Sequence, residues 1–157
     1  MRQSTLCYLL TNTNILLGRK MRGVGQGKLN GYGGKLEPGE TPEEAILREL
    51  FEESGVRAKA DELQKVAELE LVYLDRPEWN TLCHAYVLFS WEGEPRETDE
   101  MSPVWCSREH IPYHDMWIDD RHWMPLVLSG KKIRGKYVFT EAGTALEVFE
   151  SREVQTF

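Results

Sequence analysis

Cysteine is scarce in this chain of 157 residues, which has only three, at Cys7, Cys83 and Cys106. An odd number of widely spaced cysteines without a Cys-x-x-Cys pair argues against a disulfide framework and against a thiolate zinc site. Cys7 and Cys83 lie in strand-like runs, and we expect them in the core. The histidines lack a metal-binding spacing, so we interpret them as core or surface residues. They are His84, His110, His114 and His122.

Long apolar runs and an excess of positive charge are also missing. No apolar stretch approaches the roughly 18 residues of a membrane span, and the first five residues lead straight into a short apolar run, so we expect neither a membrane segment nor a signal peptide.

The 19 lysines and arginines against 26 aspartates and glutamates give a net charge of −7. Such a chain is a poor general binder of nucleic acid or anionic membrane, and an anionic substrate would need a metal and a few placed cations. We expect a soluble, cytoplasmic monomer that acts on a small molecule.

The length and a hydrophobic content of 41% fit one domain that spans residues 1–157. No repeat, linker or low-complexity stretch divides it. The order of the patterns predicts an α/β (α+β) fold in which a mixed sheet is sandwiched between helices. Strands are expected at 5–10, 15–19, 63–74, 82–91, 101–106, 131–139 and 144–150, and helices at 42–54, 107–110 and 123–128.

The helix expected at 42–54 has clear local boundaries. Thr41 and Glu44 form a capping box, and Pro42 stands at the first helical position. Gly55 follows the last turn as a left-handed stop. These signals predict where the helix begins and ends.

The two sides of this helix differ in character. One side carries the apolar stripe expected to be buried, which consists of Ile46, Leu47, Leu50 and Phe51. The other side, turned away from the main core, carries Glu49, Glu52 and Glu53 at helical offsets of three and four, so these carboxylates lie on one face and repel one another. A cation between them would relieve the repulsion, and hard oxygen ligands select Mg²⁺, Mn²⁺ or Ca²⁺. A solvated acidic face is the alternative, but it explains neither the glycines nor the arginine nearby.

A longer pattern surrounds these carboxylates. It runs Gly34, five residues, Glu40, seven residues, Arg48-Glu49-Leu50, one residue, Glu52-Glu53, one residue, Gly55-Val56. This segment resembles the Nudix box without a gap. The resemblance implies the Nudix fold and a hydrolase that uses Mg²⁺, or alternatively Mn²⁺. In such enzymes water attacks a phosphorus of a nucleoside diphosphate linked to another group.

The resemblance also implies roles for the residues of the box. Glu52 and Glu53 bind the metal, and Glu49 is either a third ligand or the base that orients the water. Arg48 holds a glutamate in place by a charge-assisted hydrogen bond. The alternative for Arg48 is a salt bridge that merely stabilises the helix.

Residues outside the helix complete the expected metal site. Gly33 or Gly34 brings a backbone carbonyl close to the metal, because glycine allows close approach. Glu40 braces the loop to the helix without touching the metal. A further carboxylate ligand comes from position 97, 99 or 100, and the family comparison favours Glu100.

Beyond the box, the chain resembles the MutT-homologue class of animal Nudix enzymes, which hydrolyse oxidised purine nucleoside triphosphates. The matching residues lie within 29–35, 99–101 and 111–126. The resemblance implies that Asn30, Asp119 and Asp120 hydrogen-bond the purine edge while Trp117 stacks on the base. One of two adjacent carboxylates in an apolar pocket is expected to keep its proton, so that the pair can both donate and accept. The alternative for residues 117–120 is a surface turn with an aromatic plug.

Further substrate contacts, and departures from this class, follow from the same comparison. The implied contacts with the sugar and phosphates are Thr5, Lys20, Gly33, Gly34 and Lys35. Val24 and Leu71 replace aromatic residues expected against the base, Tyr73 keeps one aromatic position, and Thr81 stands where a methionine is expected. The pocket should therefore have an altered shape, and oxidised guanine, oxidised adenine and methylated purines all remain candidate bases.

Two sets of alternatives stay open. The glycines of residues 23–27 could cradle a phosphate, but the helix that should follow is missing, so we favour a mobile loop at the mouth of a site.

The leading function is hydrolysis of 8-oxo-dGTP, and of 2-oxo-dATP, to the monophosphate and pyrophosphate, which keeps damaged nucleotides out of DNA. The alternatives are a Nudix enzyme for dinucleoside polyphosphates, nucleotide sugars or capped RNA, and a non-catalytic module that binds a nucleotide.

Overall fold

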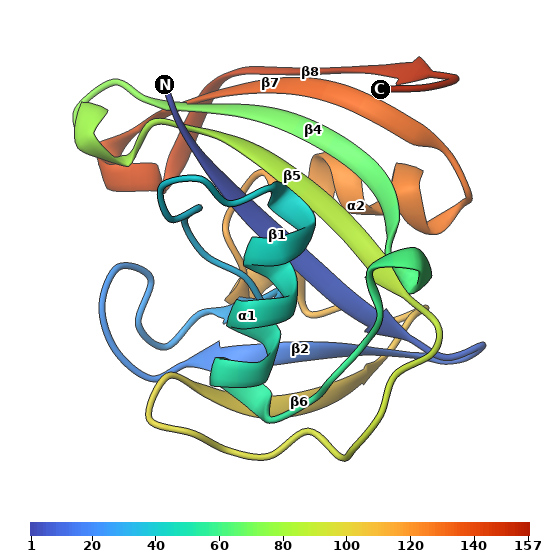
Figure 1. Cartoon of the computed structure of the whole chain (residues 1–157). Coiled ribbons are helices and arrows are strands. Elements are labelled where there is room, and N and C mark those ends of the chain that lie inside the picture. Colours follow the sequence, from blue (N-terminus) through green and yellow to red (C-terminus); the bar gives the residue numbers. More distant parts are fainter.

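The computed structural model describes all 157 residues, and it contains eight strands and two α-helices (Figure 1). The strands are β1 (Arg2–Leu10), β2 (Asn14–Lys20), β3 (Leu29–Asn30), β4 (Gln64–Tyr73), β5 (Thr81–Leu88), β6 (Met101–Ser107), β7 (Lys132–Thr140) and β8 (Ala145–Val154). The helices are α1 (Pro42–Ser54) and α2 (Asp120–Leu128). Four short 3₁₀ turns join them: η1 (Ala60–Glu62), η2 (Pro77–Trp79), η3 (Tyr113–Asp115) and η4 (Glu141–Gly143).

All eight strands belong to one mixed sheet. Seven of them follow the order β3-β2-β1-β5-β4-β7-β8, and β6 pairs with β2. The pairs β1–β5 and β4–β7 are parallel, and the other neighbours are antiparallel. β1 and β2 pair through only two residue pairs, Leu9 with Leu16 and Leu10 with Ile15. The rest of β1 is therefore free to meet the loop that follows β3, where the Cys7 N–H donates to the Tyr32 carbonyl at 2.6 Å.

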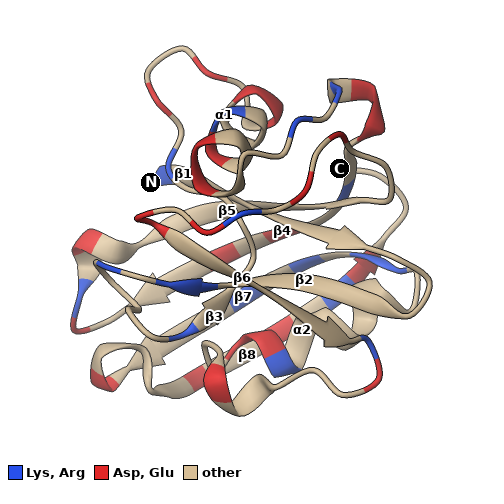
Figure 2. Ribbon diagram, turned by 90° about the horizontal axis from the view of Figure 1, so that it is seen from below, with Lys and Arg blue, Asp and Glu red and all other residues tan.

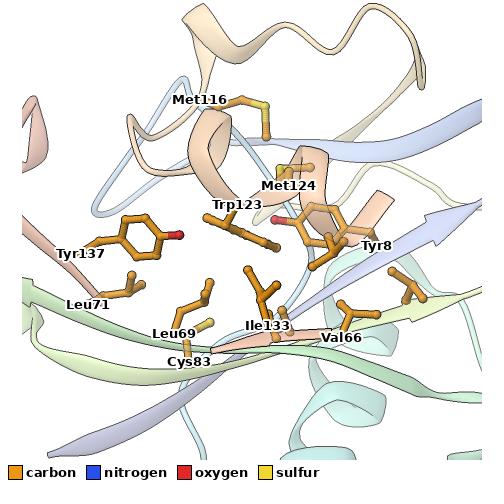
Figure 3. Close-up of a cluster of buried hydrophobic side chains, with 14 of the residues drawn as sticks. Tyr8, Val66, Leu69, Leu71, Cys83, Met116, Trp123, Met124, Ile133 and Tyr137 are labelled. Carbon is orange, nitrogen blue, oxygen red and sulfur yellow. The ribbon is translucent and has the colours of Figure 1, made fainter. Parts of the chain in front are cut away.

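The two helices lie on opposite faces of the sheet (Figures 1 and 2). The larger core lies on the α2 face and includes Tyr8, Trp123 and Tyr137 (Figure 3). The smaller core lies under α1 and includes Ile46 and Leu50. This arrangement confirms the expected mixed sheet sandwiched between helices.

The ends of α1 are where the sequence predicts them. The Thr41 hydroxyl accepts from the Glu44 N–H at 3.2 Å, and the Glu44 carboxylate accepts from the Thr41 N–H at 3.1 Å. Gly55 adopts a left-handed φ of 79°, and its N–H donates to the Phe51 carbonyl at 2.8 Å. A residue with a side chain would be strained at Gly55, which is why the helix stops there.

The buried face of α1 is narrower than the sequence predicts. Ile46 and Leu50 are buried, but Leu47 is half-buried and Phe51 is 40% exposed. The expectation that Leu47 and Phe51 form a buried pair was wrong: the Phe51 ring instead lies 4.2 Å below the Arg57 guanidinium at the surface. Acidic residues gather on α1 (Figure 2), yet Glu53 is only 8% exposed. The acidic face therefore does not point wholly away from the protein, because its last turn lies beneath the loop after β3.

Three boundaries also differ from those predicted. The helix expected at 107–110 is absent: Ser107 ends β6 and residues 108–110 form a turn, in which the Arg108 N–H and guanidinium donate to the carbonyls of Thr13 and Thr11. β5 ends at Leu88 instead of Trp91. α2 begins at Asp120, three residues before the predicted start. No helix is long and apolar enough to cross a membrane.

Candidate active site

A cavity of about 200 Å³ opens between the β1 edge, the loop after β3, the end of α1 and the start of α2. Residues far apart in the sequence line it. Those expected from the sequence are Thr5, Lys20, Val24, Asn30, Gly33, Gly34, Glu53, Leu71, Tyr73, Trp117, Asp119 and Asp120. The structure thus places the end of the acidic helix and the proposed base readers around one space.

Six lining residues were missed by sequence reasoning. They are Ser4, Leu6, Tyr8, Gly31, Cys83 and Met101. Ser4, Leu6 and Tyr8 alternate along β1, so they share one face of the strand. That period-two spacing was the available signal, but it does not distinguish a residue that lines a pocket from one that fills a core.

Glu53 is the carboxylate of α1 that reaches the cavity. Its Oε1 accepts a hydrogen bond from the Gly33 N–H at 2.9 Å. Burial, with repulsion by Glu49 and Glu100, raises the pKa of Glu53 to about 8, although the Gly33 hydrogen bond and Lys20 lower it. The three carboxylates are therefore close enough to disfavour one another's charge.

The Gly33-Gly34 segment explains how the loop comes so close to β1 and α1. A Cβ at Gly33 would lie 2.0 Å from the Thr5 carbonyl oxygen, and one at Gly34 would lie 2.7 Å from Glu49 Oε1. The Thr5 N–H donates to the Gly34 carbonyl at 2.9 Å. Only glycine fits at these positions without displacing a neighbour.

Arg48 joins the box loop to the helix. Its Nε and Nη2 donate to the two oxygens of Glu40 at 2.7 and 2.8 Å, and its Nη1 donates to Glu49 Oε1 at 2.8 Å. Nη2 also reaches the Lys35 carbonyl at 3.2 Å. The fork with Arg48 lowers the pKa of Glu40 to about 2. Glu40 thus braces the loop, and Arg48 both stabilises the helix and orients Glu49.

The other carboxylates differ in their surroundings. Burial raises the pKa of Glu49, although its bond to Arg48 opposes the shift. The Glu52 side chain is 54% exposed and lies 3.5 Å from Arg48 Nη1. Glu100 accepts from the Arg22 guanidinium, which lowers the pKa of Glu100. No three His, Cys, Asp or Glu side chains already meet as a metal-binding cluster, but the carboxylate and backbone oxygens here are the donors that hard divalent cations take.

Asp119 and Asp120 line the cavity from the start of α2, and they are 4% and 5% exposed. Asp119 Oδ2 accepts from Trp123 Nε1 at 3.0 Å. Burial raises the pKa of Asp119 to about 6, whereas burial together with repulsion by Asp119 raises the pKa of Asp120 much further. Both shifts run in the direction expected for two adjacent buried carboxylates, because charge on both at once is disfavoured, and the shift is larger at Asp120.

Trp117 is a wall of the cavity and not a surface plug. Its ring packs edge-on against Tyr73 and Trp79, at centroid distances of 6.0 and 6.3 Å. A Cβ at Gly25 would lie 3.0 Å from the Trp117 ring. The glycine-rich loop therefore packs on the aromatic wall at the mouth, which does not support the phosphate-cradle alternative.

A wider hollow adjoins the mouth of the cavity and carries positive charge. It has a volume of about 580 Å³, and its lining includes Arg2, Lys20, Lys35 and Trp79, with Glu78 as its one carboxylate. The chain as a whole has a net charge of −7, so three cations around one opening form a local attraction for an anion. Thr81, where a methionine was expected, lines this hollow and not the cavity.

Comparisons with known proteins agree with this geometry. The sequence profile of the NUDIX domain matches residues 1–127. The chain is 40% identical to the oxidized purine nucleoside triphosphate hydrolase of Mus musculus, over 99% of this chain and 97% of the relative. It is 42% identical to the protein of the same name from Danio rerio, over 86% and 85% of the two chains. The crystal structure of the mutator MutT protein from Bacillus halodurans superimposes with a TM-score of 0.83 at 22% identity, over 96% and 97% of the chains, which supports the fold alone.

Proposed function

The chain belongs to the Nudix hydrolase family, and from this premise we propose that it hydrolyses oxidised purine nucleoside triphosphates to the monophosphate and pyrophosphate. 8-oxo-dGTP and 2-oxo-dATP are the candidate substrates, and the reaction would clear damaged nucleotides from the precursor pool. One observation carries the proposal: Glu53 of the box and the pair Asp119 and Asp120 line the same cavity. The names of the relatives from mouse and zebrafish support it.

The acidic end of α1 is the proposed metal and reaction site. Glu49, Glu52, Glu53 and Glu100, with the Gly33 carbonyl, would hold Mg²⁺, because all of them offer hard oxygen donors. When bound, Mg²⁺ neutralises phosphate oxygens and lowers the pKa of a bound water. Glu49 is oriented by Arg48 and Glu53 by the Gly33 N–H before any substrate arrives. Such fixed carboxylates are suited to position a water for in-line attack.

The phosphate chain and the base occupy opposite ends in this proposal. Lys20, Lys35 and Arg2 surround the outer hollow and would neutralise the phosphates. Asp119 and Asp120 would bind the purine edge as one acceptor and one donor, because burial raises both pKa values and repulsion by Asp119 raises that of Asp120 further, so that one of the pair would keep its proton. Trp117 would stack on the base, a contact worth about 1–3 kcal/mol per base in single-strand binders.

The proposed enzyme acts as a monomer and as one Nudix domain over residues 1–157. β7 and β8 lie beyond the matched profile, but β7 pairs with β4 inside the same sheet. They therefore support the floor of the site and do not form a separate unit.

A substrate panel tests the proposal. Pyrophosphate release with Mg²⁺ is measured for 8-oxo-dGTP, 2-oxo-dATP, N6-methyl-dATP, dGTP, ADP-ribose and a diadenosine polyphosphate. We expect kcat/KM for an oxidised purine to exceed that for dGTP by at least about tenfold, because buried hydrogen-bonding groups discriminate strongly against a base that leaves them unpaired. Equal values for dGTP, or faster cleavage of the diadenosine polyphosphate, would reject it. Binding without turnover would identify a non-catalytic module.

A further inference from the structure

Tyr8 is a polar residue of the cavity without a role in the proposed chemistry. It lies on β1 and is 2% exposed, yet it lines the cavity. Its ring packs edge-on against Trp123, at a centroid distance of 6.0 Å (Figure 3). Trp123 in turn donates to Asp119. The Tyr8 ring is thus part of the wall that holds the Asp119 and Asp120 pair.

The tip of the Tyr8 ring lies beside the segment that carries Asn30, one of the groups proposed to read the base. A Cβ placed on Gly31 would come within 2.7 Å of Tyr8 Cζ and 3.1 Å of its hydroxyl oxygen, so the ring tip lies against the segment that carries Asn30. Asp120 lines the same cavity, and its charge is one of the effects that raise the pKa of Tyr8. The tip of the Tyr8 ring therefore lies beside the Asn30 segment, in a cavity that Asp120 also lines.

The protein leaves the Tyr8 hydroxyl without a partner. No hydrogen bond joins it to another protein group. Two buried polar side-chain atoms have neither a hydrogen-bond partner nor contact with solvent, Tyr32 Oη and Arg134 Nε, and the Tyr8 hydroxyl is not one of them. The small exposed part of Tyr8 must therefore include its hydroxyl, which meets the open space of the cavity. Burial, and then Asp120, raise the pKa of Tyr8 well above 10, so the hydroxyl keeps its proton and is a donor.

We propose that Tyr8 is a specificity-determining residue whose hydroxyl donates a hydrogen bond to an acceptor on the bound purine. This inference rests on the proposed function and adds a fourth reader to Asn30, Asp119 and Asp120. A base that fills the cavity would exclude water from the hydroxyl. A purine with a carbonyl oxygen or ring nitrogen at that point restores the bond, and one without it leaves a buried donor unpaired.

The test replaces Tyr8 by phenylalanine, which removes the hydroxyl and keeps the ring. Binding of 8-oxo-dGMP is followed by tryptophan fluorescence, since Trp117 and Trp123 lie in or beside the cavity, and KM and kcat are measured for 8-oxo-dGTP, 2-oxo-dATP and dGTP. We expect Tyr8→Phe to weaken binding of at least one oxidised purine by about fivefold to thirtyfold, which is the effect of one hydrogen bond. The loss should appear in Kd and KM more than in kcat.

Tyr137→Phe is the matched control. Tyr137 belongs to the same core, but its hydroxyl bonds the Ser151 hydroxyl outside the cavity. We expect this variant to bind every nucleotide like the wild type, and we expect Tyr8→Phe to melt no lower than the wild type, because its hydroxyl has no protein partner to lose.

The outcomes separate the inference from the proposed function. Unchanged Kd and KM for all nucleotides in Tyr8→Phe would overturn the inference while the wild-type activity stands. A lower melting temperature with an equal loss for every nucleotide would show a structural role and would overturn it as well. If the wild type binds 8-oxo-dGMP but releases no pyrophosphate, the proposed hydrolysis fails, and the binding ratio of the two tyrosine variants still decides the role of Tyr8. If the wild type binds no purine, both fail.

Discussion

Replacement of Arg48 by methionine should lower both stability and turnover, because this side chain holds the loop and the reactive helix together. Three of its contacts are short and charge-assisted, at 2.7, 2.8 and 2.8 Å. The side chains of Arg48, Glu40 and Glu49 are only 23%, 15% and 18% exposed. Arg48→Met would therefore leave two carboxylates without their cation in a largely buried position.

The magnitude follows from these contacts. Hydrogen bonds to charged groups contribute about 1.5–3 kcal/mol each, and removal of one partner of a buried ion pair costs about 3–5 kcal/mol. Because this cluster keeps some contact with water, we expect the lower end, about 3 kcal/mol. In a chain of this size that corresponds to a fall in Tm of about 6–12 °C.

Urea unfolding and calorimetry measure the loss, and Arg57→Met is the control. Arg57 is exposed and only stacks on Phe51, so its loss should cost less than about 1 kcal/mol. Turnover is measured well below the Tm of Arg48→Met. A low kcat at that temperature would support the claim that Arg48 orients Glu49. A full kcat in a destabilised variant would show that the role of Arg48 is purely structural. A loss of stability no larger than that of the control would refute the argument.

Two other residues give further predictions. Gly33→Ala should abolish turnover and lower the Tm, since its Cβ would lie 2.0 Å from the Thr5 carbonyl oxygen; an active, stable alanine variant would show that the loop is not held as described. The raised pKa of Asp119, about 6 against a usual 3.8, stabilises the folded state below pH 4, and this contribution is lost as the pH rises through 6. Urea unfolding from pH 4 to pH 7 should thus show the wild type losing up to about 3 kcal/mol relative to Asp119→Asn. Parallel pH curves would contradict this.

The sequence predicts α1 well because its signals are local. The capping box of Thr41 and Glu44 and the left-handed stop at Gly55 act within one turn of the helix, so they need no knowledge of the rest of the fold. The width of the buried stripe depends instead on which parts of the fold pack against the helix. Leu47 and Phe51 fit a helical period, but neither belongs to the core under α1, and the Arg57 guanidinium stacks on Phe51 instead.

The cavity was harder to predict from residues alone. Asn30 comes from β3, and Trp117 and Asp119 from the segment before α2, so they meet only through long-range contacts of the folded chain, which leave no local pattern. Their proposed roles came from resemblance to a family. Neither the local sequence pattern nor the family resemblance identified Tyr8. Alternation on a strand is the same for a tyrosine in the core and a tyrosine that lines a pocket.

The central claim is a division of labour in which the α1 carboxylates perform the hydrolysis and the far end of the cavity selects the base. Pyrophosphate release from 8-oxo-dGTP and dGTP, measured side by side for Glu53→Gln and Asp119→Ala, tests it most directly. We predict that Glu53→Gln loses at least about a hundredfold in turnover with both nucleotides, whereas Asp119→Ala still cleaves dGTP but loses most of its preference for 8-oxo-dGTP. Substantial activity in Glu53→Gln, or an unchanged preference in Asp119→Ala, would contradict the claim.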